Sequence, residues 1–519
     1  MPARESVFQA NAWRILLLIC AWLAATAWLR PLMLPDEGRY VGVAHEMLVS
    51  GDWITPTLNG LPFFHKPPLF YWITAASLAL LGDHEFAARM ASLVGGTAMA
   101  FSLFLFARRW MGERAARAAL VVALTQPLVF IGSQFANLDM LVAGCIACTV
   151  LLLAHAVLSL DAGEPVDIAL PAAYVAAALG VLAKGLIGVV LPALVIGAWL
   201  LTTRRWRLLP RLWSWTGVFA FAGIALPWFL AVQSRHPGFA HYFFIVQHFQ
   251  RFTEGGFNNV QPWWFYPAVL CVLGLPWSPW LTRQWRGGVD RPHQMLPAQR
   301  VRLLLWLWLG LVLLFFSLPQ SKLVGYVLPA LPPLCLLIAD AAPTRRSSWW
   351  AGSAMVAAAL CLGTVVFLSF HEPKTWQPLA DALSERHVDG EPVVYVGDLF
   401  YDVAFYAGLG APPVVVDEWG SAEIARHDDW RKQLADGAAF APTSASQVLL
   451  TPRQMAPYLC GHAVAWVLAT DSSAREQDWM RGATLVRQWR GAGLWRIDTA
   501  HAQAAGALPC TGQHEAWLG

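Results

Sequence analysis

The sequence predicts a polytopic α-helical membrane protein of about 11–13 spans, followed by a smaller α/β domain. Of its 519 residues, 57% are hydrophobic and only 13% are charged, whereas about 25% of the residues in a soluble protein are charged. Apolar segments recur through the first 370 residues, and the hydropathy then drops. We therefore expect a membrane domain over residues 1–370 and a second domain over residues 371–519. The expected partner is the lipid bilayer, with no nucleic acid.

Eleven apolar segments are candidate spans, because a span needs about 17–25 mostly apolar residues. They cover residues 13–30, 86–107, 115–132, 140–159, 168–183, 185–203, 213–232, 263–283, 302–317, 323–340 and 348–369. The first segment, preceded by Arg4 and Arg14, also fits a signal peptide. We favour an uncleaved first helix, because the segment has little polar c-region and many spans follow it.

Arginine clusters set the predicted topology, because positively charged loops stay in the cytoplasm. The clusters lie at residues 108–117, 204–211, 283–302 and 345–346. All four fall on the side of the N-terminus only if the apolar segment 69–81 is not a span. With about 13 residues it is too short to cross a bilayer, so we expect a helix on the outer membrane surface. The acidic loop 161–167 gives this topology no support.

The opposite side then holds the loops 31–85, 133–139, 233–262 and 317–322, together with everything after about residue 370. This side is the periplasm in a Gram-negative cell. Lysine use differs between the two sides. The chain has five lysines against 31 arginines, and the only three before residue 370 (Lys66, Lys184 and Lys322) fall near predicted outer ends of spans. A compact ammonium and a planar guanidinium meet a phosphate differently, although codon bias is an alternative explanation.

The C-terminal domain is predicted from short β-rich runs that alternate with polar or helix-forming stretches. These runs cover residues 393–396, 414–416, 448–450, 465–468 and 485–486. Six of the eight cysteines lie in apolar spans, and the other two are Cys460 and Cys510. An oxidising compartment favours pairing, so we predict a Cys460–Cys510 disulfide.

Ionisable residues gather on the predicted outer side, where they are energetically expensive and usually functional. In the first outer loop, Pro35 is followed by Asp36 and Glu37, and Arg39 and Tyr40 come next. If Asp36 begins a helix, Arg39 and Tyr40 lie at i+3 and i+4 on the same face. His65 and Lys66 follow about 30 residues later.

The later outer loops add a second carboxylate and further cations. Asp139 follows Asn137 at a span boundary, where a helix N-cap is the alternative reading. His248 and Arg251 share a predicted helical face, and Lys322 precedes Tyr326 by one turn. Cations and phenols suit a lipid-linked phosphate, and carboxylates suit an acceptor hydroxyl or a sugar cation.

These motifs, taken in order, resemble the bacterial aminoarabinose transferase family within the protein O-mannosyltransferase-like superfamily. They are Pro-Asp-Glu-x-Arg-Tyr at 35–40, His-Lys-Pro-Pro-Leu at 65–69, Asn-x-Asp at 137–139, Lys-Gly at 184–185, Gln-His-x-x-Arg-Phe at 247–252 and Ser-Lys-Leu-x-x-Tyr-x-Leu-Pro at 321–329. The resemblance covers about the first 335 residues. It implies the GT-C fold and an inverting glycosyltransferase of the bacterial inner membrane.

The resemblance also implies roles for individual residues. Asp36 corresponds to the essential outer-loop carboxylate and Asp139 to the second acidic position. Lys66, Arg251 and Tyr326 correspond to donor-phosphate ligands, with Arg39 and Tyr40 supporting them. We include Glu37, Lys184 and Lys322 as further supporting residues. The implied donor is an undecaprenyl-phosphate-linked sugar such as 4-amino-4-deoxy-L-arabinose, and the implied acceptor is lipid A or another envelope glycolipid.

Two departures from the family pattern leave the sugar and the acceptor open. His65 stands where the aminoarabinose enzymes tend to have Glu, at a position that belongs to a zinc site in the family, with His248 as the matching third-loop histidine. Histidine binds zinc, so a zinc cofactor is one open alternative and no cofactor is the other. The run Ser-Lys-Leu-Val-Gly-Tyr at 321–326 also lacks the commoner proline. Protein O-glycosylation and transport of a lipid-linked sugar are the competing functions.

Overall fold

The computed structural model describes residues 2–166, 168–250, 259–286, 295–345, 347–371 and 374–510. The chain forms two compact units. The first, here called the helical unit, comprises Met1–Arg30 and His65–Pro373. The second, here called the sheet unit, comprises Pro31–Phe64 and Lys374–Gly519. The stretch that carries Asp36 therefore packs with the C-terminal part of the chain.

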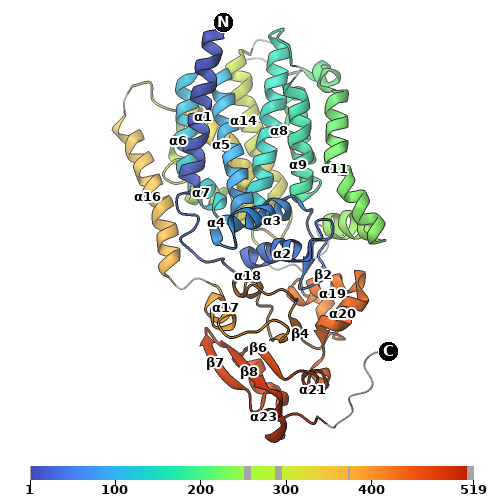
Figure 1. Ribbon diagram of the computed structural model, residues 1–519. Coiled ribbons are helices and arrows are strands. Elements are labelled where there is room, and N and C mark those ends of the chain that lie inside the picture. The colour runs from blue at the N-terminus through green and yellow to red at the C-terminus, as the bar shows by residue number, and fades with distance from the viewer. Residues whose placement is uncertain are drawn as a thin grey trace. The chain divides into compact units, whose positions relative to one another are not determined.

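The helical unit is built from apolar helices that run side by side (Figure 1). Its α-helices are α1 (Pro2–Ala24), α3 (Leu69–Leu81), α4 (Glu85–Ala88), α5 (Met90–Trp110), α6 (Glu113–Thr125), α7 (Pro127–Ser133), α8 (Leu138–Asp161), α9 (Ala169–Lys184), α10 (Ile187–Thr202), α11 (Trp215–Arg235), α13 (Phe265–Leu273), α14 (Pro297–Ser317), α15 (Leu331–Asp340) and α16 (Ser348–Phe370). Shorter helical turns are η1 (Trp206–Leu212), the π-helix η2 (His241–Gln250), η3 (Ser278–Arg286) and η5 (Val324–Ala330).

Among the described residues, five helices are long and apolar enough to cross a membrane: α5, α8, α11, α14 and α16. The pair α6 and α7 makes a sixth if it is one span, bent by 61°. The bend falls at Pro127, because a proline cannot donate the backbone hydrogen bond that would continue α6. Four other predicted spans appear as shorter apolar helices or helix pairs, at Ala12–Ala24, Ala169–Lys184, Ile187–Thr202 and Val324–Asp340. The prediction of a polytopic helical membrane protein is confirmed.

One predicted span, over residues 263–283, is not a continuous helix. Helix α13 ends at Leu273, and the separate 3-10 segment η3 starts at Ser278. Pro276 lies between them and Pro279 lies at the start of η3, and each proline removes a backbone donor. The run of apolar side chains predicted one helix, but the two prolines interrupt it.

Helix α8 is the most deeply buried of these candidate spans, with 72% of its apolar window covered by protein. It packs against α5 and α9. Gly144 of α8 and Gly95 of α5 touch directly, and an added Cβ at Gly95 would lie 2.6 Å from the backbone of Leu141. Small residues let transmembrane helices approach closely, and this contact fixes the end of α8 that carries Asp139.

Ion pairs join the loops that the arginine clusters predict to share one side. Asp161 at the end of α8 accepts hydrogen bonds from Arg205 at 2.6 Å and from Arg300 at 2.7 Å. Glu164 pairs with Arg109, and Asp340 pairs with Arg302 at 2.8 Å. Two acidic residues of the loop 161–167, Asp161 and Glu164, thus supply counter-charges for three of these arginines.

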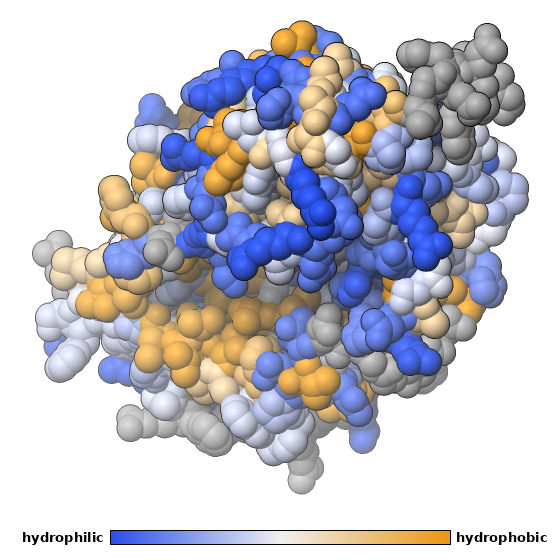
Figure 2. Space-filling view, turned by 90° about the horizontal axis from the view of Figure 1, so that it is seen from below, coloured by the Kyte–Doolittle hydropathy of each residue, from blue (hydrophilic) through white to orange (hydrophobic). Residues whose placement is uncertain are grey.

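Hydrophobic side chains reach the surface, as expected of a protein whose solvent is partly lipid. Helix α16 exposes Trp349, Met355, Phe367 and Phe370. On the face drawn in Figure 2, hydrophobic residues gather in one area while hydrophilic residues cover most of the rest.

The sheet unit contains a six-stranded mixed sheet of order β5-β4-β3-β6-β8-β7. Strands β3 (Val393–Val396), β4 (Val414–Val416), β5 (Leu449–Leu450) and β6 (Val464–Thr470) are parallel, and β7 (Thr484–Trp489) and β8 (Ala492–Asp498) are antiparallel. Its helices include α2 (Asp36–Ser50), α17 (Gln377–Ser384), α18 (Val403–Ala407), α19 (Trp430–Phe440), α20 (Pro442–Val448), α21 (Pro452–Cys460), α22 (Asp471–Glu476) and α23 (Thr499–Ala504). A short hairpin joins β1 (Thr57–Leu58) to β2 (Leu61–Pro62).

All five predicted C-terminal strands are present, and the predicted α/β domain is confirmed. The prediction missed β8, which follows a two-residue turn at Arg490 and Gly491, both with positive φ. Two such residues are typical of a tight β-hairpin. The predicted Cys460–Cys510 disulfide is formed, with the two Cα atoms 5.6 Å apart.

Backbone contacts hold the segment Pro31–Phe64 within the sheet unit. The backbone N–H of Leu34 donates to the carbonyl of Lys374 at 2.8 Å, and the side chain of Asn59 donates to the carbonyl of Pro413 at 2.8 Å. Gly38 faces the 401–402 backbone so closely that an added Cβ would lie 3.2 Å from the Asp402 nitrogen. Helix α2 is therefore carried by the C-terminal part of the chain.

Candidate active site

Helix α2 starts at Asp36 for recognisable local reasons. Pro35 precedes it, and Asp36 and Glu37 stand in its first turn, where negative charge is favourable to the helix dipole. The helix ends at Gly51, which has φ of 70° and donates its N–H to the carbonyl of Met47, as in a common helix C-cap. The prediction that Asp36 begins a helix is confirmed.

Asp36, Arg39 and Tyr40 form one acid–cation–phenol cluster on α2. Arg39 donates to Asp36 Oδ1 at 2.5 Å and to the Tyr40 hydroxyl at 3.3 Å. Its guanidinium also lies 4.8 Å from the centre of the Tyr40 ring. The side chains of Arg39 and Asp36 are 17% and 29% exposed, so both remain within reach of a substrate.

The two adjacent carboxylates of α2 have different environments. Glu37 is fully buried and accepts the backbone N–H of Met33 at 2.9 Å. Its carboxylate fixes the chain entering the helix, while that of Asp36 stays partly exposed. This contrast favours Asp36 over Glu37 as the group that meets a substrate.

Tyr401, a residue that the sequence reasoning missed, lies against this cluster. Burial raises the pKa of the Tyr401 phenol, and the charge of Arg39 opposes the shift. The hydroxyl is therefore neutral at physiological pH and can donate a hydrogen bond. It has no motif of its own, since it comes from a loop some 360 residues further along the chain.

A second cluster, in the helical unit, brings together Asp139, Lys184 and Tyr326. The Lys184 ammonium donates to Asp139 Oδ1, and it lies 4.3 Å from the centre of the Tyr326 ring. The Asp139 and Lys184 side chains are only 10% and 17% exposed. Three residues that were predicted from distant motifs to lie on the outer side thus share one site, and each comes from a different helix.

Asp139 is not a helix N-cap, contrary to the alternative that its position suggested. Helix α8 begins at Leu138, and Asn137 is the N-cap, whose side chain accepts the backbone N–H of Asp139 at 2.9 Å. Because Asn137 takes the capping role, the carboxylate of Asp139 is left for Lys184.

Gly325 makes room for the Asp139 carboxylate. A Cβ at this position would collide with Asp139 Oδ2 and lie 3.2 Å from the Asp139 Cβ. This explains the glycine in the run Ser-Lys-Leu-Val-Gly-Tyr at 321–326. Tyr266 lies nearby and donates to the carbonyl of Leu323 at 3.2 Å; the sequence offered no motif that singled it out.

Lys322 does not share the environment of Lys184. Its ammonium is buried and donates to the carbonyls of Gln261 at 2.8 Å, Pro319 at 2.5 Å and Gln320 at 3.5 Å. Since an ammonium has three donors, these carbonyls use its hydrogen-bonding capacity. Lys322 thereby fastens the turn that precedes η5.

His65 lies in a third polar group, with Tyr242 and Gln247. The His65 Nε2 atom is 3.0 Å from the Tyr242 hydroxyl, which accepts a hydrogen bond from Gln247 at 2.9 Å. The described residues contain no group of three or more His, Cys, Asp or Glu side chains that could hold a metal ion. The zinc alternative stays a prediction, because the His248 side chain lies outside the described residues.

The remaining predicted site residues are Lys66, His248 and Arg251. Lys66 is half-buried in the turn before α3. The His248 side chain and Arg251 lie outside the described residues. The roles of these residues stay predictions.

Known proteins share parts of this sequence and this fold. Residues 65–230 match the family described as dolichyl-phosphate-mannose-protein mannosyltransferase. The fold resembles that of ArnT from Cupriavidus metallidurans bound to undecaprenyl phosphate, with a TM-score of 0.77 at 24% identity, covering 95% of this chain and 98% of that one. ArnT in the apo state gives a TM-score of 0.78 at 22% identity, with coverage of 96% and 99%. These likenesses show the fold.

Sequence relatives give a more specific similarity. Undecaprenyl phosphate-α-4-amino-4-deoxy-L-arabinose arabinosyl transferase from Pseudomonas aeruginosa is 36% identical over 317 residues, which is 60% of this chain and 56% of that relative. The enzymes of the same name from Edwardsiella ictaluri and Serratia proteamaculans are 34% and 33% identical, over 60% and 63% of this chain. The chain spans little more than half the length of these relatives, between 55% and 59%.

The architecture is that of a multi-pass helical membrane protein with an ArnT-like fold. The resemblance to the aminoarabinose transferases that the sequence motifs predicted is confirmed over the matched part of the chain.

Proposed function

We propose that this chain transfers a sugar from an undecaprenyl-phosphate-linked donor to lipid A or another envelope glycolipid, with inversion at the anomeric carbon. The contact of Asp139 with Lys184, beside Tyr326, is the observation that carries the proposal. It places a carboxylate, an ammonium and a phenol at the predicted outer end of the helical unit. The names of the sequence relatives and the undecaprenyl phosphate bound to ArnT support the same donor.

The proposed location is the bacterial inner membrane, with the active site and the sheet unit facing the periplasm. The arginine clusters support this orientation. They lie on loops at the end of the helical unit opposite to Asp139, where ion pairs join these loops. The disulfide between Cys460 and Cys510 also suits an oxidising compartment.

In the proposed reaction, the bond between the anomeric carbon and the phosphate oxygen breaks, and a bond from an acceptor oxygen forms. The leaving lipid phosphate needs no proton if cations neutralise it. Arg39, Tyr40, Lys66, Arg251 and Tyr326 are the proposed phosphate ligands. Lys184 supports them by placing positive charge beside Tyr326.

Asp36 has one of two roles in this scheme, depending on the acceptor. A hydroxyl acceptor must lose a proton, which the Asp36 carboxylate would take as general base. A phosphate acceptor on lipid A is already ionised, so Asp36 would only orient it. In either case Arg39 binds Asp36 at 2.5 Å and donates to the Tyr40 hydroxyl at 3.3 Å, so the acidic group adjoins two of the proposed phosphate ligands.

Transfer by purified protein in lipid nanodiscs tests the proposal directly. The substrates are a synthetic undecaprenyl-phosphate aminoarabinose and lipid A. We expect D36N to lose at least about 100-fold in rate, which is typical of a lost general base or a lost orienting group. The control is D83N, which alters an exposed carboxylate of the same predicted outer loop and should retain activity. Transfer at the wild-type rate by D36N would contradict the assignment.

Protein O-glycosylation is a second candidate, favoured by the match of residues 65–230 to the protein mannosyltransferase family. A Ser or Thr acceptor requires a base to take its hydroxyl proton, whereas a phosphate acceptor does not. Mass spectrometry of lipid A and envelope glycans from a deletion strain separates the two. Loss of a pentosamine from lipid A phosphate supports our proposal. Unchanged lipid A together with a lost protein glycan supports the alternative.

A further inference from the structure

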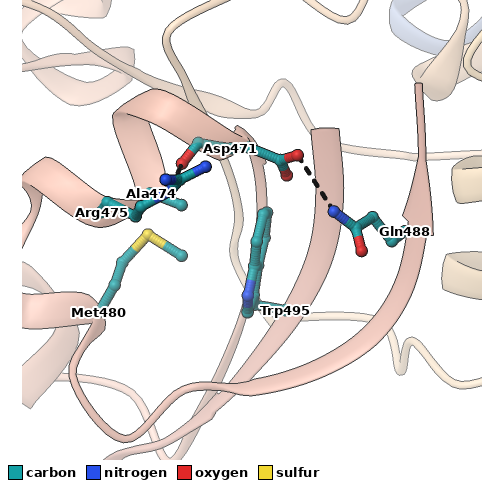
Figure 3. Close-up of a pocket in the computed structure, with 6 residues that line it drawn as sticks. All are labelled: Asp471, Ala474, Arg475, Met480, Gln488 and Trp495. Carbon is teal, nitrogen blue, oxygen red and sulfur yellow. Dashed lines mark hydrogen bonds between the residues drawn. The ribbon is translucent and has the colours of Figure 1, made fainter. Parts of the chain in front are cut away.

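The sheet unit holds a cavity of about 270 Å³ that none of the candidate active-site residues lines. Its walls come from α22, η7 (Asp478–Met480) and the β7–β8 hairpin. The lining residues are Asp471, Ala474, Arg475, Met480, Gln488 and Trp495 (Figure 3). The cavity lies on the sheet face that also carries the apolar core of this unit, since Met480 belongs to that core and Trp495 packs against it.

Trp495 forms an aromatic wall of this cavity. It lies two residues after Gly493 on β8, so both residues share one face of the sheet. An added Cβ at Gly493 would lie 2.5–2.8 Å from three atoms of the indole benzene ring. The ring therefore covers Gly493, and only a residue without a side chain fits beneath it. Figure 3 shows the indole edge-on, with Met480 and Arg475 to one side and Gln488 to the other.

Hydrogen-bond donors and acceptors surround the indole. Gln488 donates from its side-chain nitrogen to Asp471 Oδ2 at 3.1 Å, and Arg475 donates from Nε to the backbone carbonyl of Asp471 at 3.0 Å. These bonds hold the carboxylate, the amide and the guanidinium near one another. The carboxylate can accept further hydrogen bonds, and the guanidinium carries further donors.

We propose that this cavity is a carbohydrate subsite that takes one uncharged sugar ring. The C–H groups of a sugar ring carry partial positive charge and pack on the negative face of an indole. Sugar hydroxyls both donate and accept, so they match Asp471 as acceptor and Arg475 and Gln488 as donors. The volume lies just below the range of about 300–1,000 Å³ typical of drug-sized ligands, which fits a single ring.

The carboxylate of Asp471 decides between a sugar and an anion. A free phosphate would meet Arg475 but would also face the negative charge of Asp471, and like charges oppose binding. The proposal is independent of the catalytic function, because it concerns binding alone and involves neither Asp36 nor Asp139. The sugar could belong to a free oligosaccharide or to the saccharide part of a glycolipid.

Isothermal titration of the full chain tests the proposal. The protein is held in lipid nanodiscs, because maltoside detergents would themselves offer sugar rings. The titrants are a core oligosaccharide freed from its lipid and phosphates, the intact glycolipid, and inorganic phosphate. We expect the freed oligosaccharide to bind. Phosphate and the intact glycolipid also meet the proposed donor and acceptor sites, so their binding is assigned to this cavity only where W495A weakens it, and we expect W495A to leave the phosphate titration unchanged.

Variants locate the binding. We expect W495A to weaken oligosaccharide binding at least about tenfold, and W495F to stay within about threefold of wild type, because the ring face is retained. Q488A should weaken binding about fivefold through a lost hydrogen bond. The matched control is R487A, which removes an exposed neighbour on the same strand whose side chain points to the other face of the sheet. Its affinity should equal that of wild type.

Any of the following outcomes would overturn the proposal. Absence of oligosaccharide binding, or equal binding by W495A, Q488A and R487A, would show that the cavity is not a sugar site. Phosphate binding that W495A and Q488A weaken, without oligosaccharide binding, would mark it as an anion site. Dependence of only the intact glycolipid on Trp495 would show that the lipid or phosphate is recognised. If W495A fails to fold, judged by loss of the Cys460–Cys510 disulfide, the comparison of Q488A with R487A decides alone.

Discussion

The contact of Asp139 with Lys184 allows a quantitative prediction. We expect K184M to destabilise the chain by about 3–5 kcal/mol, because removing one partner of a buried ion pair leaves an uncompensated charge. The pair is well shielded, with side chains 10% and 17% exposed. Two charges about 4 Å apart at an effective dielectric constant of about 20 attract by about 4 kcal/mol. Exposed pairs, in contrast, contribute only about 0.2–1 kcal/mol.

A double-mutant cycle measures this coupling. The variants are D139L, K184M and the double variant, unfolded by SDS in mixed micelles and followed by helical circular dichroism. Since the double variant removes both charges, we expect it to be more stable than K184M alone. The coupling energy should be about 2–4 kcal/mol, below the Coulomb value because each charge also loses its solvation.

The control pair is Arg386 and Glu385, which are exposed and 3.7 Å apart. Its cycle should give less than about 1 kcal/mol. A coupling below about 0.5 kcal/mol for Asp139 and Lys184 would refute the reasoning. It would mean that the two side chains are solvated separately and that Lys184 is free to bind elsewhere.

Three further predictions follow from individual contacts. G325A should destabilise the chain by about 1–3 kcal/mol through overpacking against Asp139. The control G310A, whose Cβ would meet open space, should be neutral or stabilising. Equal melting temperatures of G325A and G310A would contradict this. Burial raises the pKa of Asp402 from 3.8 to about 6, so protonated Asp402 favours the folded chain. This stabilisation is complete below pH 3.8 and is lost as the pH rises through 6. The pKa difference of 2.2, at 1.36 kcal/mol for each pH unit, gives up to about 3 kcal/mol. D402N should flatten the melting temperature between pH 4 and 6.5, and an unchanged slope would contradict the assignment. Replacing Cys460 and Cys510 by serine opens a loop of 50 residues and should cost about 4 kcal/mol in the chain-entropy account; a loss well under 1 kcal/mol on chemical denaturation would contradict it.

Local patterns predicted the elements of this fold well. The valine runs at 393–396 and 414–416 are strands with the predicted bounds, because β-branched side chains suit a buried parallel sheet. The apolar segment 69–81 is a helix with the predicted bounds. The errors came where backbone chemistry overrode side-chain character, as at Pro276 within 263–283 and at the Arg490–Gly491 turn before β8.

The candidate site was predictable only in part, because spacing shows what one helix brings together. The i+3 and i+4 positions of Arg39 and Tyr40 placed them beside Asp36. No spacing could show that Lys184 meets Asp139, since that contact depends on how α8 packs against α9. The sequence accordingly ranked Lys184 among the supporting residues, although it binds the second carboxylate directly.

Helix α2 packs with the C-terminal part of the chain, and this part of the chain therefore supports a candidate active-site residue. Hydropathy groups residues 31–64 with the spans around them, since it compares only neighbours in sequence. The structure instead holds this segment by contacts with residues far along the chain, such as Asn59 with Pro413 and Leu34 with Lys374. Glu46 shows how firmly the segment is built, because it accepts the backbone N–H groups of Asn59 at 2.6 Å and Gly60 at 2.9 Å. The sheet unit is thus the scaffold that positions Asp36, and its stability bears directly on the candidate active site.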